Sequence, residues 1–132
     1  ERDYTALSPL VSRDDYRLVG VTDDFGSALA ATDLAVSRSG GVVWELAAAG
    51  MPTILVPYPQ ATADHQYKNA LHFSAGGGAE VVRESKLRLR EQVDARLGDE
   101  AGLRDMGQAM LKLARPQAAE EIAEGLIALA SA

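Results

Sequence analysis

The sequence predicts an α/β fold in which helices flank a parallel sheet. Short apolar runs that suit strands alternate along the chain with helical segments of about ten residues. Several of these runs contain no alternating polar residues, which is typical of strands buried on both faces of a parallel sheet. Because parallel neighbours need a crossover helix between them, this order indicates βαβ units. We therefore expect a single right-handed, Rossmann-like domain, without internal repeats or a linker.

The composition suits one globular domain and excludes several classes of partner. The chain has 132 residues, of which 47% are hydrophobic and 24% charged. Its net charge of −6 argues against nucleic acid, whose phosphates require a basic surface. Cysteine is absent, which excludes disulfides, and His65 and His72 have no carboxylate cluster at metal-ligand spacing. We expect no metal, no cofactor and no membrane span, because no apolar run approaches about 18 residues.

The first part of the chain predicts a helix, a strand and a second helix. Residues Glu1–Arg13 have apolar positions at helical spacing, which Pro9 interrupts. Tyr16–Val21 alternates polar and apolar residues and therefore predicts a strand. The side-chain oxygens of Thr22–Asp24 suit the cap of a helix, which we expect over about Phe25–Ala31.

The centre of the chain predicts two strands with a helix between them. Leu34–Val36 reads as a strand buried on both faces. A helix over about Val42–Ala49 should end at Gly50, since glycine best tolerates a left-handed cap. Thr53–Val56 has the clearest pattern of a buried strand.

The last part predicts a helix, a short strand and three amphipathic helices. Thr62 or Asp64 should cap a helix that reaches about Ala75, and Ala79–Val82 should form the last strand. Pro116 suits the first turn of the final helix. Apolar residues recur at helical spacing in each amphipathic helix: Leu89, Val93 and Leu97; then Leu103, Met106, Met110 and Leu113; and finally Ala119, Ile122, Ala123 and Leu126, which we expect to be buried.

A glycine turn follows the first central strand, where open parallel sheets bind ligands. In the run Arg38–Gly41, two glycines allow close approach of a ligand, and the next helix directs N–H groups suited to phosphate. The Arg38 side chain could add a charge-assisted hydrogen bond. The alternative interpretation is a tight strand-to-helix connection without a ligand.

Glu45 lies one turn inside the helix that follows the glycine turn. Its carboxylate could accept two hydrogen bonds from a diol such as ribose. The alternative is an exposed position or a partner of a nearby lysine. The neighbouring Trp44 is interpreted as core packing rather than as a stacking platform.

A second polar cluster follows the second central strand. Asp64, His65 and Gln66 supply donors and acceptors that suit sugar hydroxyls, although ordinary capping with solvated neighbours explains them too. No orienting partner for His65 is evident, which disfavours a catalytic base. The basic run Arg83–Arg90 suits a solvated helix entrance, with a membrane-surface patch as the alternative.

Taken together, Ser37–Ala70 resembles the donor-sugar motif of the MurG family, glycosyltransferases that add N-acetylglucosamine to the peptidoglycan precursor lipid I. The resemblance extends over nearly the whole chain, from Val21–Phe25 to Arg115–Pro116. The matching runs, in order, are Arg38–Gly40, Glu45–Gly50, Pro52, Leu55–Pro57, Asp64–Gln66 and Asn69–Ala70. The glycine turn here is one residue shorter than the common family form and lacks its threonine, which leaves backbone donors for the phosphates.

The resemblance implies a GT-B glycosyltransferase with two Rossmann-like domains. This chain would be the distal part of the C-terminal UDP-sugar-binding domain, residues 1–132, with the first βα unit, the N-terminal acceptor domain and the catalytic residues outside it. Glu45 would bind ribose, Arg38 and the Gly40–Val43 backbone would lie along the diphosphate, and His65 and Gln66 would hold the sugar. The implied substrate-binding residues are Val21 and Thr22 beside the uracil, Phe25 near the base, Arg38, Ser39, Gly40, Gly41, Val42, Glu45, Asp64, His65, Gln66 and Asn69.

The implied activity is inverting transfer of N-acetylglucosamine from UDP-N-acetylglucosamine to lipid I, which forms lipid II without a covalent enzyme intermediate. The fragment alone is expected to be inactive. The implied location is peripheral, on the cytoplasmic face of the bacterial plasma membrane. Two alternatives stay open: another GT-B UDP-sugar transferase acting on a glycolipid or natural product, and a non-catalytic UDP-sugar-binding subunit of a two-chain enzyme.

Overall fold

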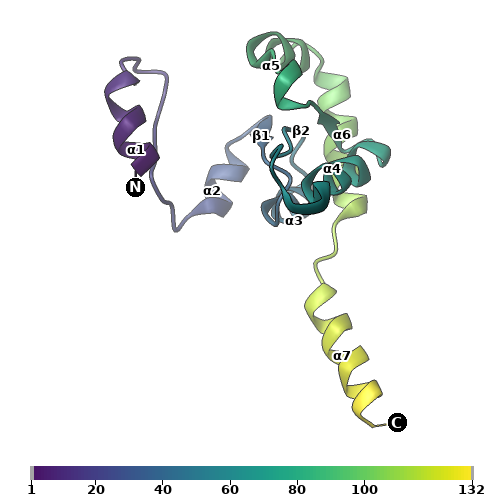
Figure 1. Ribbon diagram of the computed structural model, residues 1–132. Coiled ribbons are helices and arrows are strands. Elements are labelled where there is room, and N and C mark those ends of the chain that lie inside the picture. Colours follow the sequence, from purple (N-terminus) through teal and green to yellow (C-terminus); the bar gives the residue numbers. More distant parts are fainter. Residues whose placement is uncertain (1, 132) are drawn as a thin grey trace.

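A computed structural model describes residues 2–131 and shows a three-stranded parallel sheet with helices around it (Figure 1). The strand order is β1 (Ala35–Ser37), β2 (Thr53–Leu55) and β3 (Ala79–Val81). Val36 is opposite Ile54 in the register, and Ile54 is opposite Glu80. All three strands therefore end at the same edge of the sheet, where the loops that follow β1 and β2 meet.

Helices connect the strands and continue beyond them. The α-helices are α1 (Arg2–Leu7), α2 (Phe25–Ala30), α3 (Val42–Ala48), α4 (His65–Ala75), α5 (Leu89–Leu97), α6 (Glu100–Leu113) and α7 (Ala118–Ala130). Short 3₁₀ turns cover Ser8–Leu10, Thr62–Asp64 and Glu84–Lys86. The expected α/β order of the central chain is confirmed, with boundaries that differ by a residue or two.

The core lies on both faces of the sheet. Because successive strand residues point to opposite faces, Leu55 and Ile54 belong to different clusters. The larger cluster joins Leu55 to α3, α4 and α6, through Val43, Leu46, Ala47, Ala70, Phe73 and Met110 among others. The smaller cluster joins Ile54, Val56 and Val82, with Val93 of α5 packed against them. Apolar residues thus pack on both faces of the sheet, as is typical of parallel sheets.

Helix ends follow local chemistry at two positions. The Asp24 carboxylate accepts a hydrogen bond from the Ser27 N–H at 3.2 Å, so the predicted cap of α2 is confirmed. Gly50 has φ of +65° just after α3, as the left-handed cap requires. Asp64 occupies the N-cap position of α4, but its side chain makes no capping hydrogen bond. The expected N-cap position is therefore confirmed at Asp64, whereas capping by its side-chain oxygen is not found.

The predicted strand over Tyr16–Val21 is absent, and this prediction was wrong. The segment is not assigned to any strand, and Val21 is 87% exposed. The segment between α1 and α2, residues 8–24, lies away from the sheet (Figure 1). A strand is stable only when a neighbour offers hydrogen-bond partners, so alternation alone does not form one.

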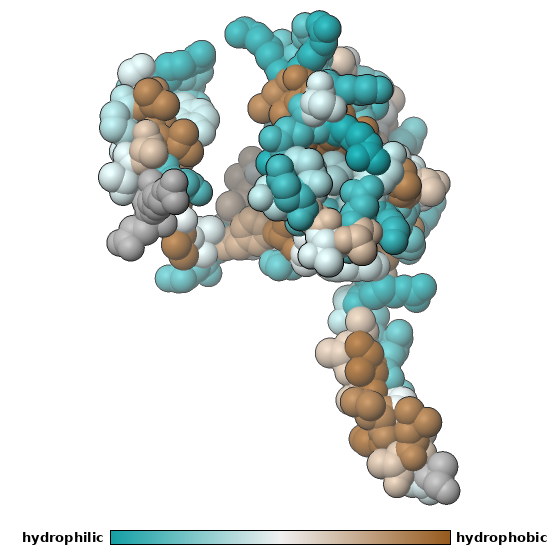
Figure 2. Space-filling view, viewed as in Figure 1, coloured by the Kyte–Doolittle hydropathy of each residue, from teal (hydrophilic) through white to brown (hydrophobic). Residues whose placement is uncertain are grey.

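The expected burial of α7 is also wrong. The helix forms, beginning at Ala118 after Pro116, but Ile122 and Leu126 are each 63% exposed. Ala119 and Ala123 are exposed as well. The helix extends alone from the body, and Figure 2 shows its apolar side chains open to solvent.

Strand β1 lies at one edge of the sheet, which changes its burial. Val36 is 43% exposed, although we expected this strand to be covered on both faces. By contrast, all three residues of β2 are buried, because β2 lies between two strands. Among residues 2–131, no helix is both long and apolar enough to cross a bilayer.

Candidate functional site

The two polar clusters meet at the carboxyl edge of the sheet. The fully buried Ser39 hydroxyl donates to the Gln66 carbonyl oxygen at 2.7 Å. In return, the Asn69 side-chain amide donates to the Ser39 carbonyl oxygen at 3.3 Å. These reciprocal hydrogen bonds fasten the glycine turn after β1 to the first turns of α4. The hydroxyl of Ser39 and the amide of Asn69 thus hold the two loops together.

The glycine turn faces open space. A Cβ atom at Gly41 would meet nothing within 4 Å, and one at Gly40 would meet only the Gln66 Nε2, at 3.9 Å. Neither glycine has the positive φ that favours this residue, since Gly50 and Gly77 are the glycines with that conformation in residues 2–131. Packing within the described chain therefore does not require these glycines. The space beside them is available to a ligand at the start of α3.

Glu45 borders an apolar pocket on α3. The pocket, of about 400 Å³, is lined by Trp44, Glu45, Ala48, Arg115, Pro116 and Ala118. Glu45 is exposed and forms no ion pair within residues 2–131, which argues against the alternative of a lysine partner. Its carboxylate is available as a hydrogen-bond acceptor at the mouth of this pocket.

Trp44 belongs to an aromatic cluster between α3 and α4. Its ring meets Phe73 edge-on with centroids 5.0 Å apart and lies 5.9 Å from the His72 ring. Phe73 is fully buried, whereas Trp44 is half-exposed toward the pocket. Trp44 therefore touches the core through Phe73. Its 40% exposure and its absence from both core clusters correct the expectation of core packing, and its ring forms part of the pocket wall beside Glu45.

The imidazole of His65 is oriented by the chain itself. Its Nδ1 lies 2.8 Å from the Thr62 carbonyl oxygen. Because a carbonyl oxygen only accepts, Nδ1 carries the hydrogen, and in neutral imidazole Nε2 is then the acceptor. Sequence reasoning found no orienting partner, since a backbone carbonyl leaves no trace in the side-chain pattern.

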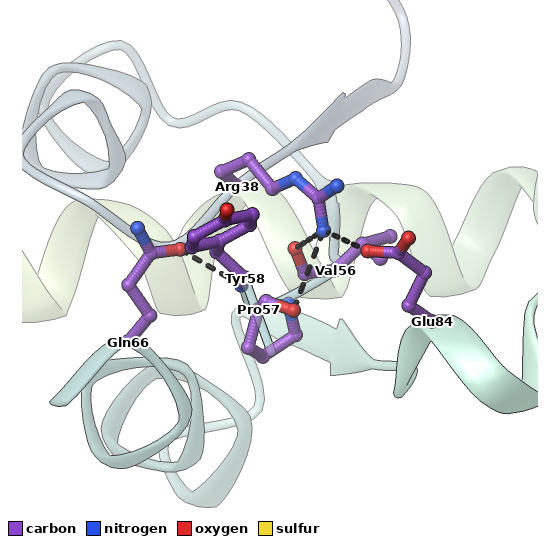
Figure 3. Close-up of polar contacts among 6 residues, drawn as sticks. All are labelled: Arg38, Val56, Pro57, Tyr58, Gln66 and Glu84. Carbon is purple, nitrogen blue, oxygen red and sulfur yellow. Dashed lines mark hydrogen bonds and ion pairs between the residues drawn. The ribbon is translucent and has the colours of Figure 1, made fainter. Parts of the chain in front are cut away.

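The Arg38 guanidinium is engaged with the loops that follow β2 and β3. Its Nη1 donates to the carbonyl oxygens of Val56 at 3.1 Å and Pro57 at 3.4 Å, and pairs with Glu84 at 2.7 Å (Figure 3). Its central carbon also lies 5.6 Å from the centre of the Tyr58 ring. The sequence did not reveal Glu84 or Tyr58 as members of this site, because only the fold brings them to Arg38.

Asp64 has a cationic neighbour after β3. Its carboxylate lies 3.6 Å from Arg83, whose guanidinium stacks over the Tyr67 ring at 3.7 Å. A pocket of about 410 Å³ is lined by Asp64, Arg83 and the Pro57–Pro59 loop, together with Glu84 and Ser85. The basic residues further along pair with nearby acids, Arg88 with Glu91 and Arg90 with Asp94, as suits a solvated helix entrance.

The three residues expected near the base lie before and at the start of α2. Val21 and Thr22 are exposed, and the Thr22 hydroxyl accepts from the Asp24 N–H at 3.1 Å. Phe25 is half-buried and packs against the larger core cluster. Neither Val21 nor Thr22 is hydrogen-bonded to the two clusters in the described chain. Residues 2–131 also contain no group of three or more metal-ligating side chains that could hold an ion.

The fold and the joined loops define a Rossmann-like domain with a candidate site at the carboxyl edge of its sheet. The glycosyltransferase family 28 C-terminal domain matches residues 1–122, and the chain belongs to this family. It is similar to two curated transferases named UDP-N-acetylglucosamine--N-acetylmuramyl-(pentapeptide) pyrophosphoryl-undecaprenol N-acetylglucosamine transferase. The one from Solidesulfovibrio magneticus is 42% identical over 113 residues, and the one from Burkholderia cenocepacia is 39% identical over 112.

The chain spans about a third of these relatives. The matched residues are 83% of this chain but 31% of the first relative and 30% of the second. The crystal structure of Acinetobacter baumannii MurG superposes with a TM-score of 0.80 at 24% identity, over 94% of this chain and 38% of that one. This match confirms the predicted fold, the C-terminal domain of a GT-B glycosyltransferase.

Proposed function

We propose that this chain is the donor-binding part of a glycosyltransferase that transfers N-acetylglucosamine from UDP-N-acetylglucosamine to lipid I, forming lipid II. The observation that carries the proposal is the junction of the two loops, in which Ser39 and Gln66 are hydrogen-bonded at the carboxyl edge of the sheet. Ligands of open parallel sheets bind at this edge. The names of the relatives specify both the donor and the acceptor, which supports this choice of substrates.

The donor would lie across the site with its three parts in chain order. Glu45 accepts from the ribose hydroxyls, the Gly40–Val43 backbone lies along the diphosphate, and His65 and Gln66 hold the sugar. The open space beside Gly41 and the unpaired carboxylate of Glu45 support this arrangement. Val21 and Thr22 would border the uracil through backbone groups, with Phe25 behind them.

The reaction would proceed by direct displacement at C1 of the sugar. The acceptor hydroxyl attacks from the face opposite UDP, the C1–O bond to the diphosphate breaks, and a base takes the hydroxyl proton. Helix N–H groups at the glycine turn stabilise the charge that develops on the leaving diphosphate. This chain would bind and orient the donor. The base, the lipid I site and the first βα unit would be supplied by the remaining length that the relatives possess.

The parent protein would act peripherally at the cytoplasmic face of the plasma membrane, because lipid I is a membrane lipid. This part of the proposal rests on the acceptor alone. Flotation of the complete protein with and without vesicles that contain lipid I measures it. Equal recovery from both samples would contradict the membrane assignment.

The decisive experiment titrates the complete protein with UDP-N-acetylglucosamine and UDP-glucose while backbone NMR shifts are followed. Shifts should concentrate at Val21–Phe25, Arg38–Glu45 and Asp64–Asn69, with tighter binding of UDP-N-acetylglucosamine. Equal affinity for both sugars would favour another UDP-sugar transferase. Binding without transfer to lipid I would favour a non-catalytic subunit of a two-chain enzyme.

The Glu45→Ala variant tests the ribose contact. Loss of a charged acceptor should weaken UDP binding by about 1–3 kcal/mol, measured by calorimetry. Glu91→Ala removes an exposed carboxylate of α5 and is a matched control that should bind UDP as the unmodified protein does. Unchanged UDP affinity in Glu45→Ala would overturn the ribose assignment.

A further inference from the structure

The peptide group between Pro57 and Tyr58 is held from both sides. Its carbonyl oxygen accepts from Arg38 Nη1 at 3.4 Å, and its N–H donates to Gln66 Oε1 at 3.0 Å (Figure 3). The two groups belong to one planar unit, so a rotation of that unit disturbs both hydrogen bonds at once. By holding the Pro57 carbonyl oxygen, Arg38 therefore also fixes the direction of the Tyr58 N–H that donates to Gln66.

This contact determines which end of the Gln66 amide faces the ligand space. A backbone N–H only donates, so the atom that meets Tyr58 must be the amide oxygen. The amide nitrogen then points away from Tyr58, and it lies 3.9 Å from the place of a Cβ atom at Gly40. Gln66 thus presents its N–H donors toward the glycine turn. A ligand group beside them must supply an acceptor, such as a sugar hydroxyl oxygen.

Arg38 is itself anchored at three points. Besides Pro57, its Nη1 contacts the Val56 carbonyl oxygen and the Glu84 carboxylate. The Val56 N–H is bonded to the Ser37 carbonyl oxygen at 2.8 Å, so Val56 is fixed to the end of β1. Proline restricts the backbone at position 57 further. The guanidinium therefore joins the ends of all three strands at one point.

The charge of Arg38 is already partly neutralised. Its ion pair with Glu84 joins two side chains that are each 47% exposed, so the pair by itself contributes little to stability. The carboxylate nevertheless offsets the positive charge that a diphosphate would meet. The contacts thus favour a structural use of the guanidinium in place of a direct contact with the nucleotide.

We infer that Arg38 is a positioning residue, which sets the Gln66 amide through the Pro57–Tyr58 peptide group and so governs recognition of the transferred sugar. The inference rests on the proposed function, because it assumes that the site takes a UDP-sugar. A positioning role of Arg38 differs from a direct phosphate contact in its effect on UDP binding. Removal of Arg38 should weaken binding of the UDP-sugar but spare binding of UDP.

The experiment compares Arg38→Met with Gln66→Ala in the complete protein. We expect each to weaken UDP-N-acetylglucosamine binding about tenfold and UDP binding less than about twofold, by calorimetry. The double variant should bind the UDP-sugar no worse than Gln66→Ala, because both changes remove one coupled contact. Arg38→Lys should recover part of the loss, since an ammonium can still donate to a carbonyl oxygen but lacks the planar shape of the guanidinium.

Arg96→Met is the matched control. Arg96 on α5 pairs with Glu80 of β3 at 2.6 Å, and within residues 2–131 neither side chain is hydrogen-bonded to Arg38 or Gln66. This variant should leave both affinities unchanged. Should Arg38→Met fail to fold in a thermal melt, Glu84→Gln weakens the same anchor more gently and should give a smaller loss in the same direction.

A second measurement separates failure of this inference from failure of the proposed function. In the ligand-free protein, the side-chain amide resonances of Gln66 should shift in Arg38→Met and stay in place in Arg96→Met. Unmoved resonances would overturn the inference whatever the ligand is. Equal loss of UDP and UDP-sugar affinity in Arg38→Met would overturn it in favour of a phosphate contact. Absence of any UDP-sugar binding by the unmodified protein would instead reject the proposed function.

Discussion

Helices α4 and α7 have similar lengths, but α4 is packed against the sheet and α7 is exposed. The 11 residues of α4 include the fully buried Ala70 and Phe73, which pack against the sheet. The 13 residues of α7 are more apolar, yet its large side chains are exposed and the helix extends from the body (Figure 2). An apolar face makes a helix able to pack, but its side chains become buried only if another element of the fold offers an apolar surface next to it.

The same contrast separates the two ends of the chain from its centre. From β1 to α6, successive elements return to the same sheet, and the polar clusters become neighbours there. Within residues 2–131, the segments before α2 and after α6 contain no strand and are not hydrogen-bonded into the sheet. Arg38, Ser39 and Gln66 in the centre are therefore held by hydrogen bonds to neighbouring loops. Val21 and Thr22 lie in the exposed segment before α2.

The largest expected effect compares Phe73→Ala with Ile122→Ala. Phe73 is fully buried, so its truncation should lower the free energy of unfolding by about 3–5 kcal/mol. Ile122 is mostly exposed, and its truncation should change this free energy by less than about 0.5 kcal/mol. Urea denaturation of the two variants measures both. A comparable loss in Ile122→Ala would mean that α7 packs against the body in solution.

The next comparison concerns two serine hydroxyls. Ser39→Ala should cost about 1–3 kcal/mol of stability, because it leaves the Gln66 carbonyl oxygen without its buried donor. Ser131 also donates to a carbonyl oxygen, that of Ile127, but in an exposed position where water replaces it. Ser131→Ala should therefore be close to neutral in the same denaturation experiment. Equal stability of Ser39→Ala and the unmodified chain would show that the two loops are held by other contacts.

The smallest effect compares two helical glycines. A Cβ atom at Gly107 of α6 would lie 2.7 Å from the Gly50 carbonyl oxygen, whereas one at Gly125 of α7 would meet nothing within 4 Å. Overpacking costs about 1–3 kcal/mol, and the better helix propensity of alanine offsets about 1 kcal/mol of it. Gly107→Ala should thus lower stability, and Gly125→Ala should raise the helical content of α7, by circular dichroism. Stabilisation by Gly107→Ala would indicate that α6 and α3 can move apart freely.

Much of the central fold was predictable because it depends on local chemistry. Gly50 determines a turn and Asp24 determines a helix start, each through residues close to it in sequence. The apolar run Thr53–Val56 likewise indicates a buried strand without reference to distant residues. The grouping of Arg38, Ser39 and Gln66 at one edge also followed from the parallel order of the strands. The partners of Arg38 did not follow, since Val56 and Glu84 are distant in sequence.

The sequence by itself determined the α/β order of the central chain, the Asp24 cap, the turn at Gly50 and the residue types at the carboxyl edge of the sheet, because these depend on short-range sterics and hydrogen bonding. The tertiary structure alone decided which apolar faces are buried, that Tyr16–Val21 has no strand partner, and that Arg38 is anchored by the loops after β2 and β3. The physical reason is that burial and strand pairing are properties of two surfaces brought together. One segment of sequence describes only one of those surfaces.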